Sequence, residues 1–209
     1  MVRVCLIWGA VAVAVAVPII AAALSPLLAW RGPIYIVAGL AGVAGLTLMM
    51  FQPLLIGGYL PGVSPYQARR AHRWTGALLV AAVVIHVAGL WITSPPDVVD
   101  ALLFTSPTPF STWGVIAMWA IFAVAIMVAL RQRLGLRLRT WRIAHTLLAA
   151  VIVIGTAVHS VLIEGTMETV SKVALCAVVV AAALKVIADK RVWQGKARRT
   201  DQRHTRDGA

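Results

Sequence analysis

Residues 72–86 read HRWTGALLVAAVVIH, an apolar stretch that begins and ends with a histidine. Residues 145–159 read HTLLAAVIVIGTAVH and repeat this pattern, again with the second histidine fourteen positions after the first. An α-helix has about 3.6 residues per turn and rises about 1.5 Å per residue, so both imidazoles of a stretch leave the same helix face, roughly 21 Å apart. The sequence therefore predicts two helices that each present two histidines at matched heights.

The rest of the chain has the composition of a membrane protein. Of its 209 residues, 61% are hydrophobic and 12% are charged. Apolar runs of roughly 18 or more residues span a bilayer as helices, and we identify six: 5–29, 34–56, 71–93, 113–131, 142–164 and 168–188. We predict an all-α membrane protein, a six-transmembrane-helix bundle in one domain (1–188), followed by a disordered basic tail (189–209). The first run also resembles a signal peptide, but its length favours a retained span.

The positive charge of the chain is distributed as in a membrane protein. The formal net charge is +12, and the basic residues gather at 69–73, at 131–142 and in the tail. All three clusters fall on one side of a six-span zigzag, and four acids fall on the other: Asp97, Asp100, Glu164 and Glu168. Cytoplasmic loops are enriched in Lys and Arg. We therefore expect both termini in the cytoplasm, an integral protein of a bacterial inner membrane in contact with lipid, and no nucleic-acid partner.

The four intramembrane histidines are the candidate site. The third and fifth spans run in the same direction, which pairs His72 with His145 at the inner level and His86 with His159 at the outer level. Ionisable side chains at membrane depth are costly and indicate function, and neutral imidazole is a common axial ligand of haem iron. We predict that these four histidines are metal ligands and hold two haems stacked across the membrane.

Small residues beside the histidines fit a flat, bulky ligand. Four residues inward from each histidine, on the same face, stand Gly76, Ala82, Ala149 and Gly155. Positions four apart lie directly above one another on a helix, so a large side chain there would collide with a macrocycle. Gly76 and Gly155 are therefore predicted cofactor contacts. Leu79 and Ile152, midway between the histidines, are expected to lie between the two haems.

Haem propionates are anionic and need polar partners. Arg69, Arg73 and Arg142, with Arg70, stand at the inner ends of the two histidine helices. Arginine suits carboxylates through its bidentate fork, and these arginines are equally well explained as topology determinants. The outer level offers only hydroxyls, which in membrane helices often bond to their own backbone: Thr93, Ser94, Thr156 and Ser160.

The histidine helices resemble a known family. The segments His72-Arg73-Trp74-Thr75-Gly76 and Trp141-Arg142-Ile143-Ala144-His145 are similar to the ferric reductase-like transmembrane domain of ferric reductases, NADPH oxidases and the haem-binding membrane subunit of bacterial methionine sulfoxide reductase systems. The resemblance covers about residues 34–188 and is specific at the four histidines. It implies that His72, His86, His145 and His159 are bis-axial ligands of two b-type haems that carry electrons across the membrane.

The chain departs from complete reductases after its sixth span. The residues that follow are too few for a Rossmann-like or flavin-binding region. We therefore expect an electron-transfer subunit of an oxidoreductase, without its own NAD(P)H or flavin domain and without catalytic side chains. Its electron donor is expected to be a separate flavoprotein reductase or a quinol, with quinone as a further candidate cofactor, and its acceptor a periplasmic protein. The alternative is a transporter or a proton or metal-ion pathway that uses the histidines.

Overall fold

The computed structural model describes residues 1–135 and 137–190, and in this part the chain is helical throughout without strands. The elements are α1 (Val2–Ala23), η1 (Pro26–Leu28), α2 (Pro33–Gly57), α3 (Pro65–Thr93), α4 (Pro95–Leu102), α5 (Pro109–Ala129), α6 (Arg131–Leu134), α7 (Leu138–Leu162) and α8 (Thr169–Lys190). Six of them are long and apolar enough to cross a membrane: α1, α2, α3, α5, α7 and α8. The prediction of an all-α integral membrane protein with six spans is confirmed.

The helix ends differ from the predicted spans where local chemistry sets them. The predicted first span reached residue 29, but α1 ends at Ala23 because Ser25 is extended and Pro26 begins the short turn η1. The third span was predicted from residue 71, whereas α3 begins at Pro65 behind a capping box between Ser64 and Gln67. A capping box satisfies free amides at a helix start, which lets α3 extend beyond its apolar part. Of the predicted tail, residues 191–209 lie outside the described part of the chain.

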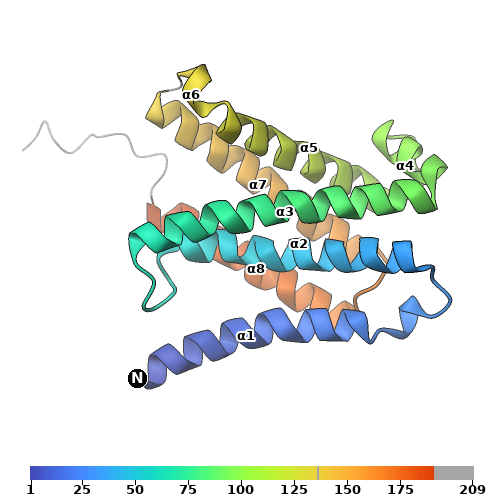
Figure 1. Ribbon diagram of the computed structural model, residues 1–209, viewed down its shortest axis with the longest axis horizontal. Coiled ribbons are helices and arrows are strands. Elements are labelled where there is room, and N and C mark those ends of the chain that lie inside the picture. Colours follow the sequence, from blue (N-terminus) through green and yellow to red (C-terminus); the bar gives the residue numbers. More distant parts are fainter. Residues whose placement is uncertain (136, 191–209) are drawn as a thin grey trace, which may run out of the picture.

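The long helices run along one common axis (Figure 1). Met1, the loop between α2 and α3, and α6 lie at one end, here called the N-terminal end, and α4 lies at the other, the far end. Helix α2 packs along α3, α5 packs along α7, and α8 lies against both α2 and α7. By contrast, α3 and α7 do not pack along each other. The two histidine helices therefore belong to two separate antiparallel pairs, α2–α3 and α5–α7.

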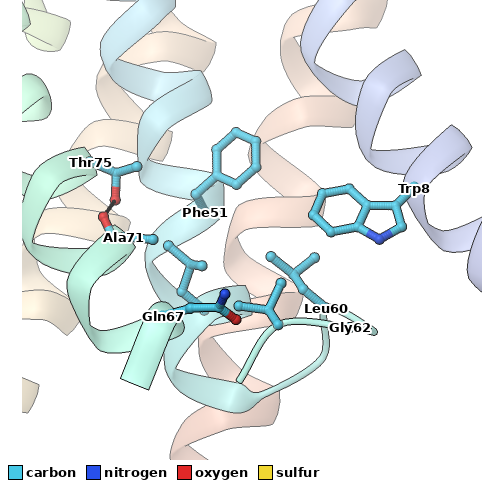
Figure 2. Close-up of a pocket in the computed structure, with 9 residues that line it drawn as sticks. Trp8, Phe51, Leu60, Gly62, Gln67, Ala71 and Thr75 are labelled. Atoms are coloured by element: carbon cyan, nitrogen blue, oxygen red, sulfur yellow. Dashed lines mark hydrogen bonds between the residues drawn. The ribbon is translucent and has the colours of Figure 1, made fainter. Parts of the chain in front are cut away.

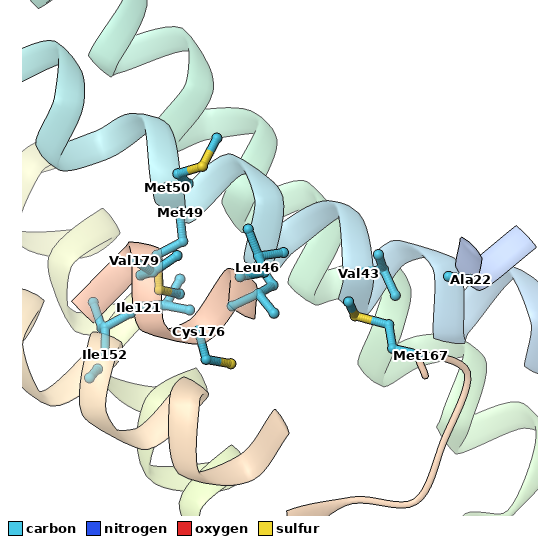
Figure 3. Packing of buried hydrophobic residues seen from close by; sticks show 12 residues of the cluster. Ala22, Val43, Leu46, Met49, Met50, Ile121, Ile152, Met167, Cys176 and Val179 are labelled. Atoms are coloured by element: carbon cyan, nitrogen blue, oxygen red, sulfur yellow. The ribbon is translucent and has the colours of Figure 1, made fainter. Parts of the chain in front are cut away.

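The centre of the bundle is a compact apolar core (Figure 3). Met49 and Met50 of α2, Ile121 of α5, Ile152 of α7 and Val179 of α8 belong to it, and each is at most 8% exposed. Large apolar side chains also cover the outer faces of the bundle, as expected for helices that contact lipid. Part of this core lies between the two histidine levels, because Ile152 stands midway between His145 and His159.

Candidate functional site: two pairs of intramembrane histidines

The structure brings the histidines together in the two predicted pairs. The ring centres of His72 and His145 are 6.2 Å apart with planes at 67°, and this is here called the first pair. Those of His86 and His159 are 6.5 Å apart with planes at 79°, and this is the second pair. The first pair lies toward the N-terminal end and the second toward the far end. Each pair joins α3 to α7 across the space where these helices do not pack.

The separation of the rings fits one metal centre between each pair. A metal–imidazole nitrogen bond is about 2 Å long, so two imidazoles on opposite sides of one metal have ring centres about 6 Å apart. Among the described residues no cluster of three or more His, Cys, Asp or Glu side chains is close enough to hold a bare metal ion. A structural zinc site needs four ligands, whereas haem iron takes only its axial ligands from the protein. The donor set therefore fits haem.

Main-chain carbonyls orient the second pair. His86 Nδ1 lies 2.8 Å from the carbonyl oxygen of Ala38 on α2, and His159 Nδ1 lies 2.9 Å from that of Phe110 on α5. A carbonyl only accepts hydrogen bonds, so in each ring Nδ1 carries the proton and donates it. Nε2 then keeps its lone pair, which is how a metal-ligating histidine is usually oriented.

Two glycines that sequence reasoning did not connect with the histidines make these hydrogen bonds possible. A Cβ on Gly42 would lie 3.0 Å from His86 Nδ1, and one on Gly114 would lie 2.7 Å from His159 Nδ1. Each glycine stands four residues after the accepting carbonyl, so the ring lies against a bare turn of helix. The sequence contains one sign of this arrangement, an internal repeat of glycine and histidine. Gly42 and Gly114 are 72 residues apart, and His86 and His159 are 73 residues apart.

The first pair is held differently. Nδ1 of His72 and Nδ1 of His145 are buried, and neither has a hydrogen-bond partner within the described part of the chain. The main-chain carbonyl of Gln52 lies near the His72 ring, but not in hydrogen-bonding geometry. Instead, Trp141 stacks on His145 with ring centres 5.2 Å apart and planes at 11°, and the Arg131 guanidinium lies over the Trp141 ring at 4.6 Å from its centre. Stacking therefore positions the His145 ring of the first pair.

The other predicted contacts divide into two kinds. A Cβ on Gly76 would meet only the Gln52 side-chain oxygen, at 3.8 Å, so this position leaves room beside His72. A Cβ on Gly155 would meet Trp113 O and Ala117 Cβ of α5, both at 3.1 Å. The structure thus gives Gly155 a role in the close packing of α7 on α5. Leu79 and Ile152 are both buried, at the height between the two pairs.

The polar residues around the two ends are also placed. Arg69, Arg73 and Arg142 are exposed near the first pair, and no described acid forms an ion pair with them. At the far end Thr93 donates back to Gly89 O of its own helix, and Ser94 bonds to Asp97. The hydroxyls of Thr93 and Ser94 therefore already form hydrogen bonds within the chain.

Sequence reasoning missed a buried cation near the second pair. Lys172 of α8 is 5% exposed, and its Nζ donates at 2.7 Å to the carbonyl of Ile163, one helical turn beyond His159. Nearby, the amides of Val170 and Ser171 donate to the Glu168 carboxylate and hold its pKa below the ordinary value. Glu168 therefore stays ionised, and the nearby positive charge of Lys172 also lowers its pKa. No sequence signal distinguished Lys172, because one lysine at a helix start is commonly solvated.

Fold and site together define a class: a helical integral membrane protein whose two central helices present paired imidazoles. The family model of the ferric reductase like transmembrane component matches residues 38–156, more than half of the chain. The chain belongs to this family, as its histidine segments suggested. The match includes His72, His86 and His145 and ends three residues before His159.

No curated protein and no solved structure matches the chain. Membership of the family assigns it a transmembrane oxidoreductase or electron-transfer role, and domains of this kind generally bind haem.

Proposed function

We propose that this protein transfers electrons across a membrane through two b-type haems, one held by the first pair and one by the second. The observation that carries the proposal is the pairing itself, with ring centres 6.2 and 6.5 Å apart between helices that do not pack on each other. When bound, haem iron supplies one-electron transfer, and the protein supplies axial ligands, burial and nearby charge. The chain is then the membrane subunit of a ferric reductase-like oxidoreductase.

Different groups of the chain would hold the iron and the propionates of each haem. Nε2 of each histidine would hold the haem iron, and the carbonyls of Ala38 and Phe110 fix the rings of the second pair. Arg69, Arg73 and Arg142 suit the propionates near the first pair, because they are exposed arginines without described acid partners. Lys172 is the corresponding cation near the second pair, since its ammonium has two donors beyond the one given to Ile163.

The charge distribution supports an orientation. The basic N-terminal end is the cytoplasmic side by the positive-inside rule, so the first pair is the inner site and the second the outer site. In this orientation electrons enter from a cytoplasmic flavoprotein or a membrane quinol and leave to a periplasmic acceptor, in a bacterial inner membrane.

The competing function is a proton or metal-ion pathway along the histidines. Such a pathway needs polar groups that continue from one level to the other. Between the two levels lie apolar core residues that include Leu46, Met49, Ile121 and Ile152. The spacing of fourteen residues, roughly 21 Å along a helix, is far beyond the reach of a hydrogen bond. This arrangement favours electron transfer over ion transfer.

A reduced-minus-oxidised absorption spectrum of the purified protein tests the proposal. We expect the bands of b-type haem, a ratio of two haems per chain, and the low-spin resonance signals of bis-histidine iron. A preparation made with haem available that shows no such bands would refute the proposal. In that case, proton or metal-ion flux in vesicles would decide for the alternative.

A further inference from the structure

A pocket of about 420 Å³ opens at the N-terminal end between α1, α2 and α3 (Figure 2). It is separate from the histidine pairs, and its lining includes Trp8 of α1, Phe51 of α2, Leu60 of the connecting loop, and Gln67, Ala71 and Thr75 of α3. No lining side chain is charged. A phosphate or carboxylate would be unpaired there, and burying an unpaired charge is costly. The pocket therefore suits a neutral ligand.

Two aromatic side chains line the pocket. Trp8 and Phe51 stand on opposite sides of it (Figure 2). The indole of Trp8 donates from Nε1 to Pro61 O at 3.2 Å, which fixes the orientation of its ring. Aromatic rings stack favourably in offset or edge-to-face arrangements. A ligand with a flat ring can therefore stack on these two side chains.

Polar groups converge on the same space. The side-chain oxygen of Gln67 accepts a hydrogen bond from the Ser64 amide at 2.9 Å, so its NH₂ group remains to donate to a ligand oxygen. The Thr75 hydroxyl also lines the pocket. The ligand thus combines a flat ring with oxygen substituents and an apolar remainder.

The position of the pocket connects it to the membrane and to the first pair. Trp8 is 40% exposed and neighbouring Leu6 is 67% exposed on the lipid-facing surface of α1, so an apolar tail can enter from the bilayer. On the other side, Ala71 and Thr75 flank His72 along α3. Gln52 donates to the Thr75 hydroxyl at 2.8 Å, so the pocket-lining Thr75 is bonded to the side chain whose oxygen would lie 3.8 Å from a Cβ on Gly76.

We propose that this pocket binds a membrane quinol, which is the electron donor in the proposed function on which this inference rests. Its ring lies between Trp8 and Phe51, the Gln67 amide donates to one ring oxygen, and its tail extends into lipid. Oxidation of the quinol to the quinone releases two electrons and two protons. With haem bound at both pairs, the two irons would take up one electron each, and the protons would pass to water at the N-terminal end.

Photolabelling measures binding directly and independently of electron transfer. The full-length protein with its haems is illuminated with an azido-benzoquinone that has a short alkyl tail, and labelled peptides are mapped by mass spectrometry. We expect saturable labelling of Trp8 and the 51–63 segment that unlabelled quinone suppresses. Gln67→Leu, which removes the amide donor but keeps the volume, should raise the half-saturating concentration about tenfold. Gln132→Leu, an exposed glutamine at the same end, is the matched control and should change nothing.

Quinol-driven reduction of the haem absorption bands is the second readout. Gln67→Leu should slow it about tenfold at low quinol concentration, while dithionite still reduces both haems. Labelling spread evenly over lipid-facing peptides, or equal behaviour of Gln67→Leu and Gln132→Leu, would overturn the inference. So would rapid reduction by reduced flavin mononucleotide with none by quinol. A dithionite spectrum without b-type haem would instead refute the proposed function, whereas the labelling pattern still decides whether the pocket binds quinone.

Discussion

The two histidine pairs share their spacing and ring separation but differ in what holds the rings. In the second pair, both Nδ1 atoms donate to helix carbonyls exposed beside Gly42 and Gly114. In the first pair, neither Nδ1 has a described partner, and one ring is fixed by the stack of Arg131, Trp141 and His145. The same ligand type at two levels is therefore expected to give two chemically different sites.

The difference in hydrogen bonding predicts which of the two sites has the lower reduction potential. A hydrogen bond from Nδ1 raises the basicity of an imidazole ligand, and a more basic ligand stabilises ferric over ferrous iron. The second site should therefore have the lower reduction potential. At the first site, the nearby Arg131 cation acts in the opposite sense, because positive charge favours the reduced iron.

The largest expected effect comes from removing one ligand. His159→Ala should lower the haem content from two to one per chain, because in the proposed function each pair holds its own haem and apolar core residues lie between the pairs. His86→Ala should give the same remaining spectrum, and His72→Ala the complementary one. Pyridine haemochrome assay against protein concentration measures the ratio. Loss of both haems from every single variant would contradict two independent levels.

A smaller but selective effect should follow from adding a methyl group beside the second pair. The Cβ of Gly114→Ala would lie 2.7 Å from His159 Nδ1, and that of Gly42→Ala 3.0 Å from His86 Nδ1. Overpacking of this kind costs about 1–3 kcal/mol. We expect weaker retention of the second haem in both variants, with Gly114→Ala the more severe, and no change at the first.

Gly9→Ala is the matched control for these glycine variants, since nothing lies within 4 Å of a Cβ at Gly9. Haem retention during dilution and the midpoint of thermal unfolding measure the effect. An equal loss of both haems in Gly114→Ala would mean that the glycine supports the bundle and not the ring of His159.

Periodicity was sufficient to predict the spans and the pairing of the histidines. His72 and His86 lie on one face whatever packs against them, and span parity then determines which histidines meet. The carbonyls of Ala38 and Phe110 were not predictable in this way, because every helical residue has a carbonyl and only tertiary packing brings one to a ring. Gly42 was visible in the sequence as one small residue among several on its helix, and only the structure distinguishes its role from that of Gly45.

Two further features depended on tertiary contacts. Trp141 has the position of an interfacial anchor, yet its ring stacks on His145. Gly155 was expected to leave space for a macrocycle, but it contacts the backbone of α5. In both cases the sequence predicts the position along the helix, while the direction of packing comes from a neighbouring helix.

The comparison between the pairs predicts two separate reduction potentials. A hydrogen bond is worth about 1 kcal/mol, which corresponds to roughly 40 mV for one electron. We therefore expect two waves in a redox titration, separated by tens of millivolts, with the second site lower. Titration of the single-haem variants His159→Ala and His72→Ala assigns the waves. A lower potential in His159→Ala, which keeps the first site, would reverse the proposed order.

The smallest expected effect concerns the cation over Trp141. Arg131→Gln removes the charge that stacks through Trp141 onto His145, an interaction worth about 0.5–1 kcal/mol. Because a positive charge favours the reduced iron, its removal should lower the potential of the first site by roughly 20–40 mV, and so bring the two waves closer together. Arg133→Gln, on the same short helix α6, is the control, since among the described contacts its guanidinium covers no aromatic ring. If both variants shift the first wave equally, the effect comes from the general charge of the N-terminal end; if only Arg131→Gln shifts it, the stack itself tunes the site.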